Sequence, residues 1–91
     1  MQRYSWDEEK NGTLRTMRGI SFEEVVEVIA QGGLVDVLRH PNPRRYGHQK
    51  LFVVRCLGYV YLVPFVESPG KIFLKTIIPS RKYMRRYGGK Q

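Results

Sequence analysis

The chain has 91 residues, enough for one domain with a modest core, and it carries a formal net charge of +8. Its single cysteine, Cys56, excludes an internal disulfide, and no apolar stretch has the length of a membrane span or the form of a signal peptide. We therefore expect one cytoplasmic domain over residues 1–91, without a membrane partner.

The charge is divided unevenly along the sequence. Residues 1–36 hold four basic and seven acidic side chains, a net charge of −3. Residues 37–91 hold twelve basic side chains and a single acid, Glu67, a net charge of +11. Such asymmetry is typical of a protein that binds a polyanion or an acidic protein. Plain solubilising charge is the alternative explanation.

Two helices are predicted in the first third of the chain. Residues 5–8 (SWDE) fit a capping box, which predicts a helix over residues 7–17 that ends at Gly19. Residues 21–24 (SFEE) fit a second capping box. Apolar residues then recur at helical spacing over residues 22–31, and the following glycine pair ends this second, amphipathic helix.

Four strands are predicted after the helices, over residues 34–39, 50–55, 59–66 and 71–78. Pro64 lies inside the third strand. Because proline cannot donate to a ladder, it predicts an edge position or a bulge there. Together the elements predict an α+β fold with two N-terminal helices, a four-stranded antiparallel sheet and a short basic C-terminal helix.

The junction between the last strand and the last helix is the main functional candidate. Pro79 ends the strand, and Ser80 is a good N-cap. Arg81 and Lys82 then place two cations in the first helical turn, where the helix dipole already puts partial positive charge. Local conflicts of this kind are typical of functional sites, so the junction predicts an anion site, with phosphate as the ligand.

The remainder of this helix is predicted to be two-sided. At 100° per residue, Tyr83, Met84 and Tyr87 fall on the side expected to dock on the sheet. The opposite side carries the predicted RNA-binding cations Lys82, Arg85 and Arg86, together with Arg81. A solvated C-terminal tail is the alternative. Arg81 is the strongest candidate because its guanidinium can bind phosphate through two parallel hydrogen bonds.

A second group of candidates comes from the loop at residues 40–49. Arg44 and Arg45 supply charge, and Tyr46 can stack on a base. His48 is a candidate general base for RNA cleavage, next to Lys50, although a surface role is the alternative. No spacing of His, Cys or acidic residues matches a metal site, and no cofactor motif is present, so neither a metal nor a cofactor is predicted.

Several segments together carry a family resemblance. They are Trp6-Asp7 with Lys10-Asn11, RGISFEE at residues 18–24, YLVPF at residues 61–65 and KTIIPSRK at residues 75–82. In combination they resemble the BrnT family of bacterial type II toxin–antitoxin systems, which is similar in fold to the RelE/ParE-type toxins. The resemblance extends from about Tyr4 to Tyr87.

The resemblance implies a small ribonuclease that inhibits growth by cutting RNA without a metal. It also implies neutralisation by a cognate antitoxin, a DNA-binding protein with an acidic segment that covers the basic face. Arg81, Lys10, Arg18 and Lys50 match positions of the family pattern, whereas His48 is a candidate from its chemistry alone.

The mechanism predicted from both lines of argument is attack of the ribose 2′-hydroxyl on the adjacent phosphate. Arg81, with Lys50 and Lys82, would hold that phosphate, and His48, a tyrosine or Lys10 would take the proton. Two alternatives remain open: a non-catalytic module that binds nucleic acid with the same basic face, and an accessory subunit that its basic helix anchors to a ribosome.

Overall fold

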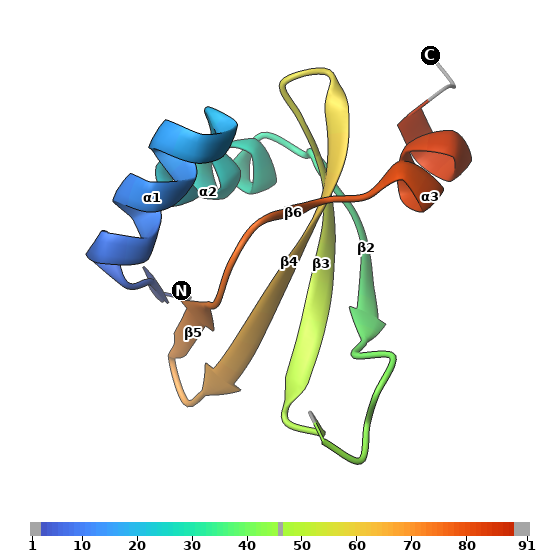
Figure 1. Cartoon of the computed structure of the whole chain (residues 1–91). Coiled ribbons are helices and arrows are strands. Elements are labelled where there is room, and N and C mark those ends of the chain that lie inside the picture. The colour runs from blue at the N-terminus through green and yellow to red at the C-terminus, as the bar shows by residue number, and fades with distance from the viewer. Residues whose placement is uncertain (1–2, 46, 89–91) are drawn as a thin grey trace.

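The computed structural model describes residues 3–45 and 47–88. Its helices and strands are arranged as Figure 1 shows. In chain order they are β1 (Arg3–Ser5), α1 (Glu8–Arg18), α2 (Phe22–Ala30), β2 (Leu34–Arg39), β3 (Gln49–Cys56), β4 (Tyr59–Ser68), β5 (Lys71–Leu74), β6 (Ile78–Pro79), α3 (Arg81–Tyr83) and the π-helix η1 (Met84–Gly88).

The described strands form one sheet in the order β1-β5-β4-β3-β2, and β6 also pairs with β4. The predicted antiparallel run of four strands is present as β2 to β5, so the α+β class is confirmed. The predicted count of four strands is too low. β1 lies parallel to β5 and makes the sheet mixed, and the predicted strand over residues 71–78 is split into β5 and β6.

The two N-terminal helices begin and end at local signals. The second capping box is confirmed, because Ser21 and Glu24 exchange side-chain-to-backbone hydrogen bonds at the start of α2. The first capping box is wrong. Ser5 lies in β1, and Asp7 caps α1 by accepting a hydrogen bond from the Glu9 N–H group (2.9 Å). Gly19 ends α1 in the left-handed conformation, with φ of 69°, as glycine allows.

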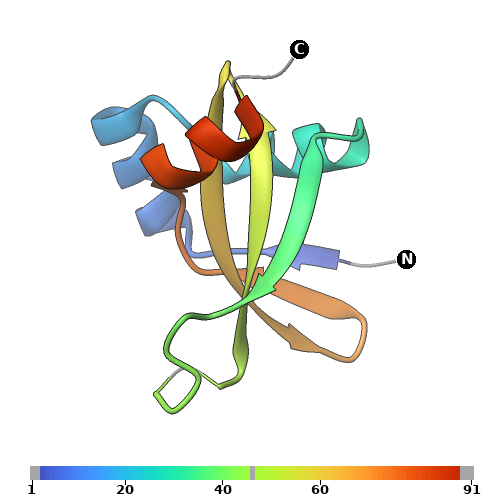
Figure 2. The same cartoon turned by 90° about the vertical axis from the view of Figure 1, so that its right-hand side faces the viewer.

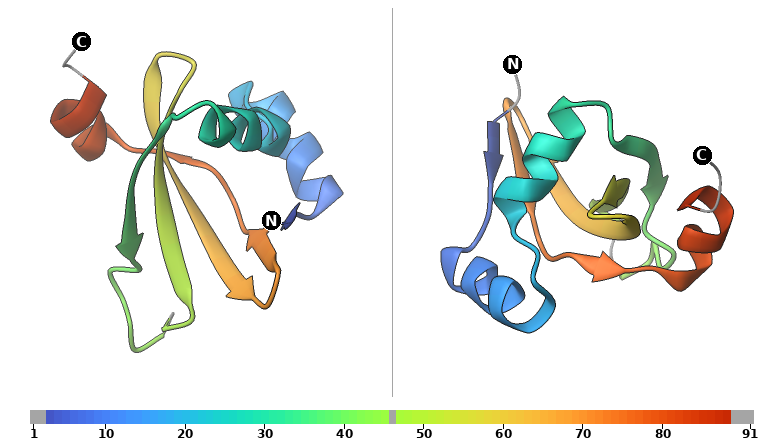
Figure 3. Two further views of the ribbon diagram at one scale, coloured as in Figure 1. Left: turned by 180° about the vertical axis from the view of Figure 1, so that it is seen from behind. Right: turned by 90° about the horizontal axis from the view of Figure 1, so that it is seen from above.

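One face of the sheet packs against α1 and α2 and forms the main core. Leu14 of α1 and Phe22 of α2 contact the buried residues of β3, β4 and β5 that point to this face. In β3 these are Phe52, Val54 and Cys56, at the period of two expected for a strand with one face in the core. The C-terminal helix lies on the opposite face of the sheet, as Figure 1 and the view from above in Figure 3 both show.

Pro64 is buried in the middle of β4, which is a central strand, so the predicted edge position is wrong. Its register opposite Leu51 in β3 is regular. On its other side the pairing shifts by one residue between Phe65↔Leu74 and Leu62↔Ile78, so an irregularity of the predicted kind does lie opposite Pro64. The Pro64 carbonyl accepts a hydrogen bond from the Lys75 N–H group (2.8 Å), just after β5 ends. Because proline has no N–H group to return that bond, the ladder from β5 stops here, and β6 pairs with β4 further along.

No helix within residues 3–45 and 47–88 is long and apolar enough to cross a membrane.

Candidate nucleic-acid interface

The basic C-terminal helix begins at a junction that hydrogen bonds hold against β4. The Ser80 N–H group donates to the Val60 carbonyl (3.0 Å), and the Ser80 hydroxyl accepts from the Tyr83 N–H group (3.1 Å). Ser80 is therefore the N-cap, as predicted, and it is buried. The exposed side chain of Arg81 thus extends from a fixed backbone.

The C-terminal helix has the predicted two sides over residues 81–87. It starts as one α-helical turn and continues as a π-helix. Tyr83, Met84 and Tyr87 are half-buried, and Tyr83 and Tyr87 stack with ring centroids 6.0 Å apart. The cations on the outer side are exposed; they are Arg81, Lys82, Arg85 and Arg86.

Two polar contacts fasten the far end of this helix to neighbouring strands. The Tyr87 hydroxyl donates to the Asp36 carboxylate of β2 (3.1 Å), and the Arg55 guanidinium of β3 donates to the Tyr87 carbonyl (2.5 Å). Partial burial raises the pKa of the Tyr87 phenol, and the Asp36 carboxylate raises it further. The phenol therefore keeps its proton and remains a donor near neutral pH. A solvated tail does not describe residues 81–87.

Arg18, at the end of α1, reaches the segment that leads into the helix. Its guanidinium donates to the Ile77 carbonyl (3.2 Å). Ile77 is followed directly by β6, and Ser80 and Arg81 come next. Two of the predicted catalytic residues, Arg18 and Arg81, therefore lie at the two ends of β6, and both are exposed.

Tyr61 belongs to this region but was not among the predicted site residues. It is half-buried and pairs with Pro79 across the β4–β6 ladder. Burial is the main cause that raises the pKa of its phenol, and the positive charge of Arg18 acts in the opposite direction with the smallest effect. The alternating pattern of residues 59–66 indicates a core residue, and Tyr61 does pack against the core cluster, opposite Val54 on the α1 and α2 side of the sheet. Only the position of β6 shows that Tyr61 also pairs with Pro79, next to the junction.

The remaining predicted catalytic residues lie elsewhere. Lys50 pairs with Phe65 on β4, five residues from the Val60 position that holds the junction. At about 3.3 Å per residue this is a separation of roughly 17 Å along the strand. Lys50 also shares its sheet face with Phe52, on the side of α1 and α2. A single phosphate cannot contact both Lys50 and Arg81.

The loop between β2 and β3 is at the opposite end of the sheet from the C-terminal helix, as Figure 2 shows. His48 is exposed in this loop, and so are Arg44 and Arg45. Lys10 is exposed on α1. The prediction for Tyr46 lies outside the described residues.

Apart from Lys10 on α1, the candidate cations form two groups, which we name by position. The helix site comprises Arg18, Arg81, Lys82, Arg85 and Arg86. The loop site comprises Arg39, Arg44, Arg45 and Lys50. Arg39 was not among the predicted residues, because its relation to Lys50 depends on strand register and cannot be read from the sequence.

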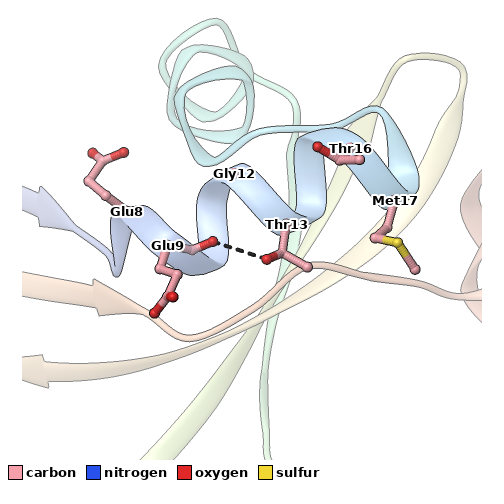
Figure 4. A pocket seen from close by; sticks show the side chains of 6 residues that line it. All are labelled: Glu8, Glu9, Gly12, Thr13, Thr16 and Met17. Atoms are coloured by element: carbon pink, nitrogen blue, oxygen red, sulfur yellow. Dashed lines mark hydrogen bonds between the residues drawn. The ribbon is translucent and has the colours of Figure 1, made fainter.

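The outer surface of α1 carries a shallow depression of different character (Figure 4). Glu8 and Glu9 lie at one end and Met17 at the other, and the Thr13 hydroxyl donates to the Glu9 carbonyl (3.1 Å). Its two carboxylates make this surface unsuited to a nucleic acid. Across residues 3–45 and 47–88, no group of three or more His, Cys, Asp or Glu residues is placed to hold a metal ion.

Comparison of the chain with protein-family profiles, with curated proteins and with solved structures finds no match in any of the three.

Proposed function

We propose that this protein is a cytoplasmic toxin of a type II toxin–antitoxin pair, a ribonuclease that binds RNA at the helix site and cuts it without a metal. The observation that supports the proposal is the fixed placement of Arg18 and Arg81 at the two ends of β6. The Arg18 guanidinium is bound to a main-chain carbonyl, and the Arg81 side chain extends from a hydrogen-bonded backbone. Cations placed in this way can position a phosphodiester more accurately than cations on a flexible tail.

The proposed reaction is attack of a ribose 2′-hydroxyl on the adjacent phosphorus. A new bond forms between the 2′-oxygen and phosphorus, and the 2′-hydroxyl gives up its proton to water. The bond from phosphorus to the 5′-oxygen breaks, that oxygen takes up a proton, and the products are a 2′,3′-cyclic phosphate and a 5′-hydroxyl. Arg81, with Lys82, stabilises the additional negative charge of the pentacoordinate transition state.

Proton transfer in this geometry is assigned to a tyrosine rather than to His48. Tyr61 lies beside Pro79, next to the junction, whereas His48 belongs to the loop at the other end of the sheet. A phenol is protonated near neutral pH and can therefore give its proton to the departing 5′-oxygen. The antitoxin in this proposal carries an acidic segment that covers the helix site.

A second candidate is a non-catalytic RNA-binding module. It is favoured by one observation: both histidines of the chain belong to residues 40–48, at the far end of the sheet from Arg81. The same basic surface would then hold RNA without cutting it.

The test is incubation of the purified protein with a defined single-stranded RNA in EDTA. We expect cleavage that leaves a 2′,3′-cyclic phosphate, reduced by about 10²- to 10³-fold in Arg81→Gln, which removes a donor to the transition state. Tyr61→Phe should also be slow, and His48→Ala should be close to wild type. Lys71→Gln is the matched control, since it removes one exposed positive charge from β5.

The outcomes separate the candidates. Tight RNA binding without cleavage by the wild type would overturn the ribonuclease and support the binding module. Equal activity in Arg81→Gln and Lys71→Gln would contradict the helix site as the place of reaction.

A further inference from the structure

The two strand ends that flank the 40–48 loop bring two cations together. Arg39 and Lys50 are directly opposite each other in the antiparallel β2–β3 pair. Their side chains therefore leave the same face of the sheet, with Cβ atoms about 5 Å apart. Like charges in this relation destabilise a strand pair. A sequence that keeps such a conflict is typical of a binding site.

Only one of these cations has a counter-charge. Lys50 Nζ lies 3.3 Å from Glu67 Oε1. The Arg39 guanidinium forms no hydrogen bond or ion pair with any residue that the structure describes. The sequence contains no acid between Asp36 and Glu67. Positive charge therefore remains uncompensated at this end of the sheet.

The two side chains face a pocket of about 260 Å³. It is lined by Arg39, His40, Pro43, Gly47, Gln49 and Lys50. The loop that forms its wall is tightly closed, because a Cβ atom on Gly47 would lie 2.8 Å from the Pro43 carbonyl oxygen. The Asn42 N–H group donates to His40 Nδ1 (3.1 Å), which fixes the imidazole in the wall. The pocket thus has a defined shape as well as charge.

We propose that this pocket binds a phosphate group, with Arg39 and Lys50 as its two cationic ligands. The planar guanidinium of Arg39 can form two parallel hydrogen bonds to phosphate oxygens, and the ammonium group of Lys50 supplies a compact charge beside it. The pocket lies at the opposite end of the sheet from the helix site and on the opposite face. The proposal therefore does not depend on the proposed ribonuclease activity. The same chemistry fits a phosphodiester of an RNA strand or the monoester of a nucleotide.

The test follows backbone amide shifts of His40, Gln49 and Lys50 by NMR during three titrations. The probes are inorganic phosphate, adenosine 5′-monophosphate and a short single-stranded RNA without terminal phosphates. We expect saturable shifts that weaken about tenfold in Arg39→Gln, the effect of removing one charge-assisted hydrogen-bond donor. Lys71→Gln should bind like wild type. Tighter binding of the monoester would assign a nucleotide, and tighter binding of the oligomer would assign an RNA strand.

Glu67→Gln gives a reciprocal test. Because Glu67 competes with the ligand for Lys50, its neutralisation should strengthen phosphate binding by roughly two- to fivefold. Absence of saturable shifts with all three probes would overturn the proposal, and so would equal losses in Arg39→Gln and Lys71→Gln. Either result would leave RNA cleavage at Arg81 unaffected, so failure of the pocket is distinguishable from failure of the proposed function.

Discussion

At the scale of single residues, Asn11 joins the two N-terminal helices. Its side chain is fully buried; the carbonyl accepts from the Phe22 N–H group (2.8 Å) and the amide donates to Glu23 (2.8 Å). The first of these bonds satisfies an N–H group at the start of α2, which has no partner within its own helix. Arg15 also approaches Glu23, at 3.3 Å, but this pair is exposed and contributes little.

The Glu23 carboxylate therefore couples folding to pH. The hydrogen bond from Asn11 is the main cause that lowers its pKa below the ordinary value of 4.5, helped by the backbone and by Arg15. Because the folded state holds the charged form more strongly, this stabilisation is fully present above about pH 4.5. It is lost as the pH falls through the lowered pKa of the folded state.

We predict that Glu23→Gln has a lower free energy of unfolding than wild type near neutral pH, because it lacks the charge that Asn11 stabilises. Urea unfolding should show a difference in free energy of unfolding between wild type and Glu23→Gln near neutral pH. This gap should narrow as the pH falls below about 4.5. Thr16→Ala, at an exposed position of α1, removes no ionisable group and is the control, so its difference in stability from wild type should not narrow in acid. A gap between wild type and Glu23→Gln that stays constant with pH would contradict the role of the charge.

At the scale of elements, the Ser80 cap determines how firmly the basic helix is attached. The Ser80 hydroxyl satisfies the Tyr83 N–H group, and the helix has only one α-helical turn before it becomes a π-helix. Ser80→Ala should therefore destabilise the protein by about 1 kcal/mol, whereas Ser80→Gly should destabilise it by only about a few tenths of a kcal/mol.

Denaturant unfolding measures the loss of stability, and hydrogen exchange at Tyr83 shows whether it arises at the helix start. Faster exchange there in Ser80→Ala should accompany weaker RNA binding, because Arg81 would no longer extend from a fixed backbone. Unchanged exchange in Ser80→Ala would show that the cap does not hold the helix.

The elements differ in how well the sequence predicts them, and the difference follows the range of the interactions. The capping box of α2 and the cap at Ser80 are set by residues within one turn, and both were predicted. β1 has three residues and forms only because β5 offers an edge, so no local pattern indicates it. The interruption between β5 and β6 depends on Pro64 in a different strand.

The candidate site shows the same division. The sequence correctly separated the exposed and half-buried sides of the C-terminal helix, because that depends on helical periodicity. The mechanism predicted from the sequence placed Lys50 beside Arg81. The two residues lie at opposite ends of the sheet, and their separation is determined by strand register, which the sequence does not show. Arg39 and Tyr61 were missed for the same reason: each acquires its relevant neighbour only through strand pairing.

At the scale of the whole molecule, the uneven charge of the sequence becomes two separate basic surfaces. The helix site lies at the β3–β4 hairpin end, and the loop site lies roughly 17 Å away along the strands. Each cation that neutralises a backbone phosphate releases counterions, so the salt dependence of binding counts the contacts made. The phosphate contacts made by the helix site and those made by the loop site can therefore be counted separately, from variants of each site.

The last prediction uses that count. For a single-stranded RNA, the slope of log K against log salt concentration should become shallower by about 1.4 when Arg85 and Arg86 are both changed to Gln, since each contact contributes about 0.7. The double change Lys71→Gln with Lys75→Gln removes the same charge from the β5 region and should leave the slope nearly unchanged. Binding measured by fluorescence anisotropy over a range of salt concentrations provides both slopes. Equal slopes in the two double variants would mean that RNA responds to net charge alone and does not occupy the outer side of the C-terminal helix.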